Sequence, residues 1–243
     1  MEEETPRCLV KSRSCSFICW RLSVYQERKR KIVLLVLVYV DDMVVSGPNG
    51  YYIVLFKELL GNDFEITDLG ELKFMLGILI TRDRYNRLIY LNQSAYISRI
   101  LTWFELQDAT PVSTPLLVKH NLSTTQSPQS EAEKQAYKNY AGDIHYLSLV
   151  GSLLFATQTW PDIQFTVNLV AQFGGNPGIT HLEAAKHILH YLKGTIDLNL
   201  VLGRRIKGGF DLVGWTDSNW AQDPDDHWST SGFAFDVEGG VIL

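Results

Sequence analysis

Two adjacent aspartates between apolar segments are the residues of this sequence best suited to carry chemistry. Asp41 and Asp42 follow the aliphatic residues 32–40 and precede the apolar residues 43–45. Carboxylates at the tip of an apolar hairpin are costly to leave unpaired, and a divalent cation removes that cost. Mg²⁺ prefers oxygen ligands, and nucleotidyl transfer uses two such ions about 3.5–4 Å apart. The pattern predicts a magnesium site; the alternative is that Asp41-Asp42 only makes a hairpin turn.

Histidines and cysteines are weaker candidates. His187 and His190 are three residues apart in a helical segment with lysine neighbours, and His181 shares no four-residue spacing with His187. This arrangement favours solvated or interhelical roles over metal binding. The three cysteines, which lie near the N-terminus without a Cys-x-x-Cys pair, indicate reduced thiols rather than disulfides or zinc: Cys8, Cys15 and Cys19.

The elements that would position these residues form a mixed α/β pattern. Strands are predicted at residues 32–40, 43–45, 72–80, 87–91, 198–202, 210–215, 232–237 and 240–243. Helices are predicted at residues 51–60, from Ser94 as the cap to 104, at 144–157, from Pro161-Asp162 onward, and at 181–193. Residues 1–25 show no clear period, and residues 105–140, with prolines and many polar residues, predict a linker.

Composition limits the class of protein. The hydrophobic fraction of 46% indicates a globular chain with a real core, and the net charge of −5 gives no support for a basic nucleic-acid channel. The longest apolar run, residues 32–40, is too short to span a membrane. No secretory signal is recognisable, and the acids at positions 2–4 are unsuited to a transit peptide. We therefore expect an intracellular protein that is neither secreted nor embedded in a membrane.

A series of motifs resembles one family. Tyr39-Val40-Asp41-Asp42 is similar to the catalytic signature of reverse transcriptases. Further segments resemble, in order, those of copia-type retrotransposon Pol polyproteins, and the match covers residues 22–243. These segments are Asp68-Leu69-Gly70, Leu76-Gly77-Ile78, Pro111-Val112-Ser113-Thr114-Pro115, Val150-Gly151-Ser152-Leu153-Leu154-Phe155-Ala156, Pro161-Asp162-Ile163, Asn176-Pro177, Tyr191-Leu192-Lys193-Gly194-Thr195, Trp215-Thr216-Asp217-Ser218-Asn219-Trp220-Ala221 and Ser229-Thr230-Ser231-Gly232-Phe233.

The resemblance implies a fold made of parts of two enzymes, within the α/β (α+β) class. Residues 1–24 stay unassigned, and residues 25–104 would be a partial reverse transcriptase palm with a thumb-like region. Residues 105–140 would be a linker and 141–196 a helical connection. Residues 197–243 would be a truncated RNase H-like domain with an incomplete sheet.

The same resemblance assigns metal ligands and partners. Asp41 and Asp42 would be catalytic and bind Mg²⁺, and Asp217 would be the first metal-binding carboxylate of RNase H; its alternative role is to end a strand and cap a turn. The implied partners are an RNA template, a DNA primer or an RNA–DNA hybrid. Departures from the family pattern remove positive charge: Trp160 replaces an arginine, and His227-Trp228 replaces a basic pair.

The resemblance also implies acids that this sequence does not supply. The family palm needs a further Asp well upstream of the hairpin, and RNase H needs further acids after Asp217. We therefore expect an RNA-directed DNA polymerase by descent that is catalytically inactive alone. The alternatives are a non-catalytic module that binds nucleic acid or an intact polymerase, and an unrelated α/β structural protein.

Overall fold

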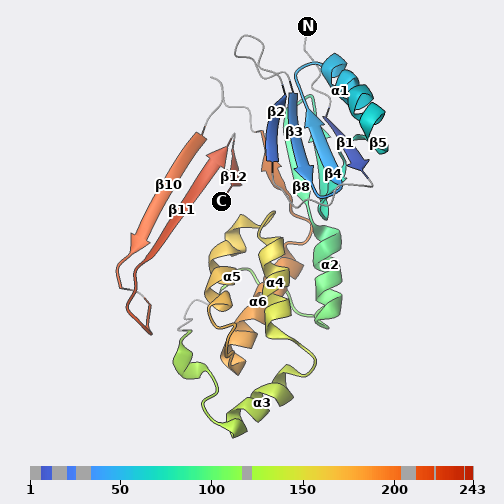
Figure 1. The fold of residues 1–243 in the computed structure, drawn as a ribbon. Coiled ribbons are helices and arrows are strands. Elements are labelled where there is room, and N and C mark those ends of the chain that lie inside the picture. Colours follow the sequence, from blue (N-terminus) through green and yellow to red (C-terminus); the bar gives the residue numbers. More distant parts are fainter. Residues whose placement is uncertain are drawn as a thin grey trace. The chain divides into compact units, whose positions relative to one another are not determined.

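The chain forms two compact units. The computed structural model describes residues 7–12, 21–25, 34–116, 122–203, 212–221, 223–237 and 239–242. The units are Met1–Met75 and Leu76–Leu243. Both combine helices with antiparallel strands (Figure 1), which confirms the α/β expectation. None of the described helices is long and apolar enough to cross a membrane.

The first unit is a sheet covered by one helix. Five strands pair in the order β2-β3-β4-β1-β5, and α1 lies against the sheet (Figure 1). Leu34 and Val36, which alternate along one strand, pack with Val45 and Ile53 in a small core, so one face of the sheet is buried under α1. The bounds are β1 (Arg7–Ser12), β2 (Arg21–Tyr25), β3 (Leu34–Tyr39), β4 (Asp42–Ser46), α1 (Gly50–Asp63), β5 (Ile66–Glu71) and β6 (Phe74–Met75).

Two strands of this sheet were not predicted. Residues 1–25 show no period, yet β1 pairs with both β4 and β5, and β2 pairs with β3. Such short strands carry little pattern of their own, and pairing with apolar neighbours decides their structure. The sequence analysis, which left residues 1–24 unassigned, therefore missed the strands at residues 7–12 and 21–25, while residues 1–6 and 13–20 lie outside the described part.

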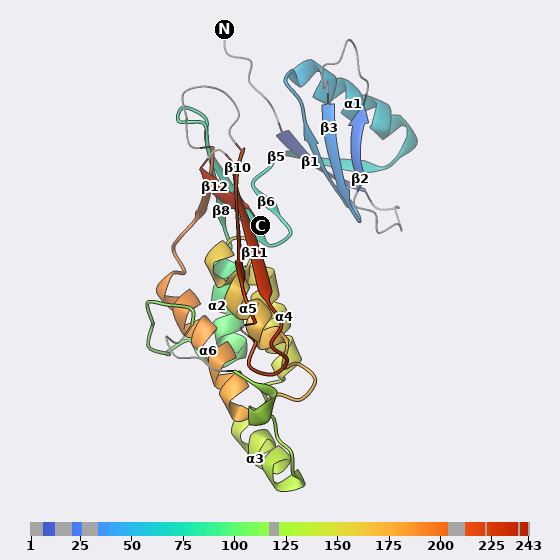
Figure 2. The ribbon, with the colours of Figure 1, turned by 90° about the vertical axis from the view of Figure 1, so that its left-hand side faces the viewer.

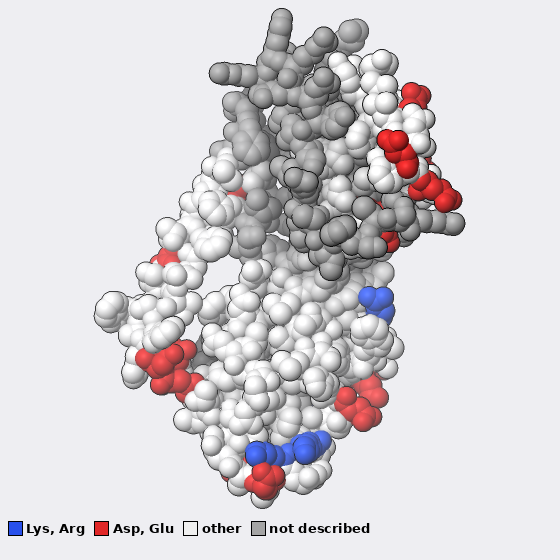
Figure 3. Space-filling view, viewed as in Figure 1, with Lys and Arg blue, Asp and Glu red and all other residues white. Residues whose placement is uncertain are grey.

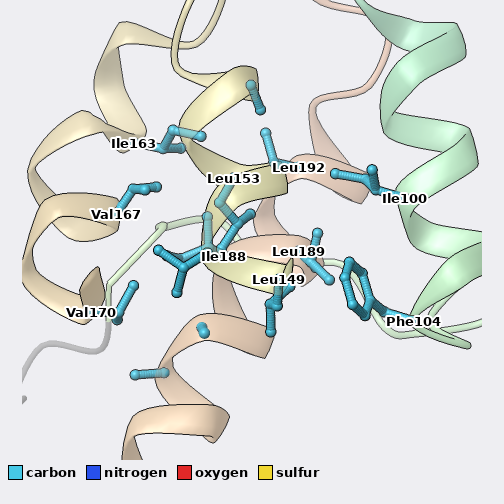
Figure 4. Close-up of a cluster of buried hydrophobic side chains, with 14 of the residues drawn as sticks. Ile100, Phe104, Leu149, Leu153, Ile163, Val167, Val170, Ile188, Leu189 and Leu192 are labelled. Atoms are coloured by element: carbon cyan, nitrogen blue, oxygen red, sulfur yellow. The ribbon is translucent and has the colours of Figure 1, made fainter. Parts of the chain in front are cut away.

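The second unit has a helical core. Ile97, Leu149, Leu153, Ile188 and Leu189 are fully buried in a cluster that α2, α4, α5 and α6 share (Figure 4). The helices are α2 (Ser94–Trp103), η1 (Thr124–Gln126), α3 (Glu131–Ala141), α4 (Tyr146–Ala156), η2 (Pro161–Ile163), α5 (Gln164–Ala171) and α6 (Ile179–Gly194). The predicted helices at 144–157 and 181–193 are thus confirmed within two residues.

Two local predictions were wrong. Helix α3 lies inside the predicted linker, because Ser130 and Glu133 form a reciprocal capping box at its start. Ser94 does not cap α2 with its side chain. Instead, the Ser94 backbone N–H donates to Oδ1 of Asn92 at 2.8 Å, and Ser94 is the first helical residue.

Two groups of strands complete the second unit. β7 (Ile78–Asp83), β8 (Leu88–Asn92) and β9 (Leu200–Leu202) are antiparallel neighbours, and β10 (Leu212–Asn219), β11 (Thr230–Val237) and β12 (Gly240–Ile242) form a separate sheet. Figure 2 shows β10 and β11 as a long hairpin beside the helices. Large aromatic side chains of this hairpin, among them Trp215 and Phe233, are more than half exposed.

Candidate active site

The Asp41-Asp42 pair lies at the tip of the β3–β4 hairpin, as predicted. Tyr39 and Asp42 are register partners, and Val40 and Asp41 make the turn between them. Val40 has a φ of 50°, a left-handed conformation that is uncommon for a β-branched residue. Both aspartates are half-buried. The turn therefore holds two carboxylates in sequence on a strained, short connection, which suits cation binding as well as turn formation.

The strand on the other side of β4 is β1. In the register of β1 and β4, Lys11 is the partner of Asp42, and the preceding residue Val10 is the partner of Met43. Directly opposed positions of an antiparallel pair lie on the same face of the sheet, about 4.5–5.5 Å apart at Cβ. A third carboxylate for a metal pair could come from this position, but the chain has a lysine there.

Asp217 lies within β10, two residues before the strand ends at Asn219. Its side chain is exposed, and its Oδ1 accepts a hydrogen bond from the Ser218 backbone N–H at 2.8 Å. Its register partner on β11 is Gly232. The residue is therefore on a strand, where the family resemblance expects it, and its local hydrogen bond is one that a purely structural aspartate also makes.

No metal cluster is present in the part of the chain that the structure describes. Among those residues, no three histidine, cysteine, aspartate or glutamate side chains are grouped so that they could hold an ion. Asp41 and Asp42 belong to the first unit and Asp217 to the second. The Asp41-Asp42 pair and Asp217 are therefore two separate candidates, and both offer carboxylate oxygens, the type of ligand that Mg²⁺ prefers.

His181 is a buried structural residue. Its Nδ1 accepts from the Gly178 backbone N–H at 2.9 Å, and its Nε2 is 3.1 Å from the Ser123 carbonyl oxygen, to which it must donate. The ring stacks on Phe173 with centroids 3.9 Å apart. Burial lowers the pKa of His181, against the opposing effects of the Ser123 hydrogen bond and the Asp225 charge. The imidazole is thus neutral, with one tautomer fixed.

The other two histidines of α6 hold an extended segment against this helix. His187 Nε2 lies 3.0 Å from the Thr114 carbonyl oxygen, and His190 Nδ1 lies 2.8 Å from that of Thr110. Lys193 also donates to the Gln107 carbonyl oxygen. The sequence favoured solvated or interhelical roles for these histidines; the structure instead gives each ring a hydrogen bond to a carbonyl of a loop.

Asp225 fastens the connection between β10 and β11 to η1. Its Oδ1 accepts from the Ser123 hydroxyl at 2.6 Å and its Oδ2 from the Thr124 backbone N–H at 2.7 Å. These two hydrogen bonds lower the pKa of Asp225. Because His181 binds the carbonyl of the same Ser123, the hairpin connection, η1 and α6 form one hydrogen-bonded unit.

A family comparison identifies the region that contains the hairpin. Residues 11–118 match the family described as reverse transcriptase (RNA-dependent DNA polymerase). Over 200 residues the chain is 30% identical to an uncharacterized mitochondrial protein of Arabidopsis thaliana, AtMg00810, and covers 77% of that protein. The chain belongs to the reverse transcriptase family.

Retrotransposon polyproteins are further relatives of this chain. It is 39% identical over 212 residues to the Retrovirus-related Pol polyprotein from transposon TNT 1-94 of Nicotiana tabacum. The aligned region covers 86% of the chain and 15% of the polyprotein. It is 31% identical to the Pol polyprotein from transposon RE1 of Arabidopsis thaliana, over 87% of the chain and 13% of that polyprotein. These relatives confirm the copia-type Pol resemblance inferred from the motifs. The chain spans only a small part of their length. No solved structure matches it significantly.

Two features of the site were not found from the sequence. Lys11 was overlooked because only the register of β1 shows that it is paired with Asp42. Asp225 was overlooked because its partners lie about a hundred positions earlier in the chain, beyond the reach of any local spacing. A serine followed by a cap-forming Gln126 was the available local signal for η1.

Proposed function

We propose that this chain is a copia-type reverse transcriptase and RNase H segment that does not catalyse DNA synthesis by itself. The family implies nucleic-acid substrates, which here would be an RNA template with a DNA primer, or an RNA–DNA hybrid. Asp41 and Asp42 would be the palm carboxylates that bind Mg²⁺, and Asp217 the first RNase H carboxylate.

The observation that carries the inactivity is the shortage of carboxylates around the hairpin. Two-metal catalysis needs several acidic ligands to hold two ions about 3.5–4 Å apart. Within the described residues, Asp41 and Asp42 are not joined by a third acid, and the position paired with Asp42 carries Lys11. One weakly held Mg²⁺ is the most that two neighbouring carboxylates of this geometry would bind.

Primer extension tests the proposal. The purified full chain would be incubated with an RNA template, an annealed DNA primer, deoxynucleotides and Mg²⁺, beside an active reverse transcriptase as the positive control. We expect no extension above background, either for the natural chain or for Asp41→Asn. Robust extension that disappears in Asp41→Asn would contradict the proposal.

A gain of metal binding tests the geometric part of the proposal separately. Lys11→Asp exchanges a lysine for a carboxylate residue at the register position paired with Asp42, so Mg²⁺ affinity should rise by about tenfold. Lys11→Asn removes the cation without adding a ligand and should give a smaller gain. Isothermal titration with Mg²⁺ measures both; affinities of the two variants that equal that of the natural chain would show that position 11 does not contribute to the site.

A further inference from the structure

A groove of about 690 Å³ lies in the second unit between α5 and the β10–β11 hairpin. One wall is helical and includes Gln164, Phe165 and Asn168, and the other includes Asn219 and Phe233. The hydrogen bonds of Asp225 to η1 anchor the connection between the two strands, so the strand wall is tied to the helical part of the unit.

The helical wall carries a row of carboxamides. Gln164, Asn168 and Gln172 are spaced four residues apart, and all three line the groove. They therefore lie on the same side of α5, with Gln172 at its C-terminal cap. Within the described residues, none of these three side chains makes a hydrogen bond to another protein group. Carboxamides both donate and accept, which is what the alternating N–H and C=O groups of an extended main chain require.

Two exposed phenyl rings flank these polar groups. Phe165 is 55% exposed and Phe233 is 65% exposed, and both line the groove. Thr230 and Ser231 add hydroxyls along the strand wall. A surface that alternates hydrogen-bonding groups with apolar side chains suits a polypeptide segment, in which the main chain binds the amides and side chains pack on the rings.

The charge of the groove disfavours nucleic acid. Its described lining includes Asp223 and no lysine or arginine. Figure 3 shows acidic side chains gathered at this end of the hairpin, whereas the basic side chains visible on the second unit lie by α2 and α3. Phosphate backbones bind through lysine and arginine, so a negatively charged strand would meet repulsion here. A basic segment would instead meet a complementary carboxylate.

We propose that this groove binds an extended, basic polypeptide segment of a partner protein. The carboxamides of Gln164, Asn168 and Gln172 bind its main chain, Phe165 and Phe233 pack against its apolar side chains, and Asp223 pairs with a lysine or arginine. This binding is independent of the Asp41-Asp42 hairpin and of any polymerase activity.

Fluorescence anisotropy of labelled probes tests the proposal on the full chain. The probes are an eight-residue peptide of alternating lysine and valine, a matching peptide of glutamate and valine, and single-stranded oligouridylate. We expect the basic peptide to bind and the acidic peptide and the RNA to bind at least tenfold more weakly. Tighter binding of the RNA, or equal binding of the two peptides, would overturn the proposal.

Paired variants locate the binding. Phe165→Ala should weaken the basic peptide about tenfold, because an exposed ring that packs on a ligand is lost. Asp223→Asn, which keeps the side-chain oxygen that accepts from the Asp225 backbone N–H, should weaken it about fivefold. Phe74→Ala and Asp197→Asn alter exposed residues outside the groove lining and should leave affinity unchanged. Circular dichroism verifies folding of every variant; loss of affinity in the controls as large as in the groove variants would refute the location.

Discussion

Val40 has a left-handed backbone conformation that its β-branched side chain disfavours. Its φ of 50° is costly for a β-branched side chain, by about 1–2 kcal/mol relative to right-handed backbone. Glycine adopts this conformation freely but loses more entropy on folding. Strain of this kind gathers at functional sites, and here it sits beside the two hairpin carboxylates.

Val40→Gly should therefore leave the first unit as stable as the natural chain, or more stable by up to about 1 kcal/mol. Val44→Gly, in the regular β4 strand, is the matched control and should destabilise the unit by about 1 kcal/mol. Urea denaturation followed by circular dichroism measures both. Equal losses of stability in the two variants would show that the turn is not strained.

His181 makes stability depend on pH. Its pKa in the fold is lowered from 6.5, while the unfolded chain binds a proton near the ordinary value. The unfolded state thus binds more protons, so the contribution of the neutral ring is fully present above pH 6.5 and is lost as the pH falls below it. Protonation would also direct an N–H at the Gly178 N–H.

The melting temperature should therefore fall between pH 7.5 and pH 5.5, and by less in His181→Gln, which can still accept from Gly178 and donate to Ser123. His145→Gln is the control, since that ring is exposed and contacts only the Ser148 hydroxyl within the described residues. Differential scanning calorimetry across this pH range measures the effect. A pH dependence that is identical in His181→Gln and the natural chain would contradict the assignment.

At the scale of elements, apolar runs were predictable and pairing-dependent strands were not. Residues 32–40 and 43–45 contain enough β-branched side chains to specify β3 and β4 on their own. β1 and β2 lack such a run and were missed. The strand at residues 198–202 was predicted, but its pairing with β8 across more than a hundred residues is encoded in no local pattern. The hairpin carboxylates were found because they follow an apolar run, whereas Lys11 needed the register of β1.

Helix α3 was missed because its composition is polar, although the sequence contains the capping motif that marks its start. The Ser130 hydroxyl accepts from the Glu133 N–H at 3.2 Å, and the Glu133 carboxylate accepts from the Ser130 N–H at 3.2 Å. The hydrogen bonds from the Gln129 and Ser130 N–H groups lower the pKa of Glu133. A serine followed three residues later by a glutamate is the signature of a helix start even without apolar periodicity.

Ser130→Ala should destabilise α3 by about 1 kcal/mol, because the Glu133 backbone N–H loses its acceptor. Ser94→Ala is the matched control: Ser94 begins α2 without capping it, so its hydroxyl should be dispensable. Amide hydrogen exchange resolves the loss within α3. Faster exchange in α2 of Ser94→Ala, as large as that in α3 of Ser130→Ala, would contradict the capping assignments.

At the scale of the molecule, the two units differ in how much apolar material they bury. The larger cluster of buried residues belongs to the second unit, while the first unit buries Leu34, Val36, Val45 and Ile53 under one helix. Hydrophobic burial is the main favourable contribution to folding. The second unit should therefore be the more stable of the two.

Leu153→Ala, at a fully buried position of α4, should destabilise the second unit by about 2–5 kcal/mol. Val45→Ala should destabilise the first unit by less than this, because less side-chain volume is removed. Hydrogen exchange with mass spectrometry follows each unit separately. Faster exchange spread equally over both units in either variant would show that they unfold as one.

Among the strands that the structure describes, β10 lies at one outer edge of the β10–β11–β12 sheet. A strand in that position presents its main-chain groups sideways, ready to accept another strand from a different molecule. Its side chains include the exposed Leu212 and Trp215, which would add apolar contact to such pairing. Concentrated preparations of this protein should consequently self-associate through strand addition, and charged substitutions along β10 are the natural means of keeping it monomeric.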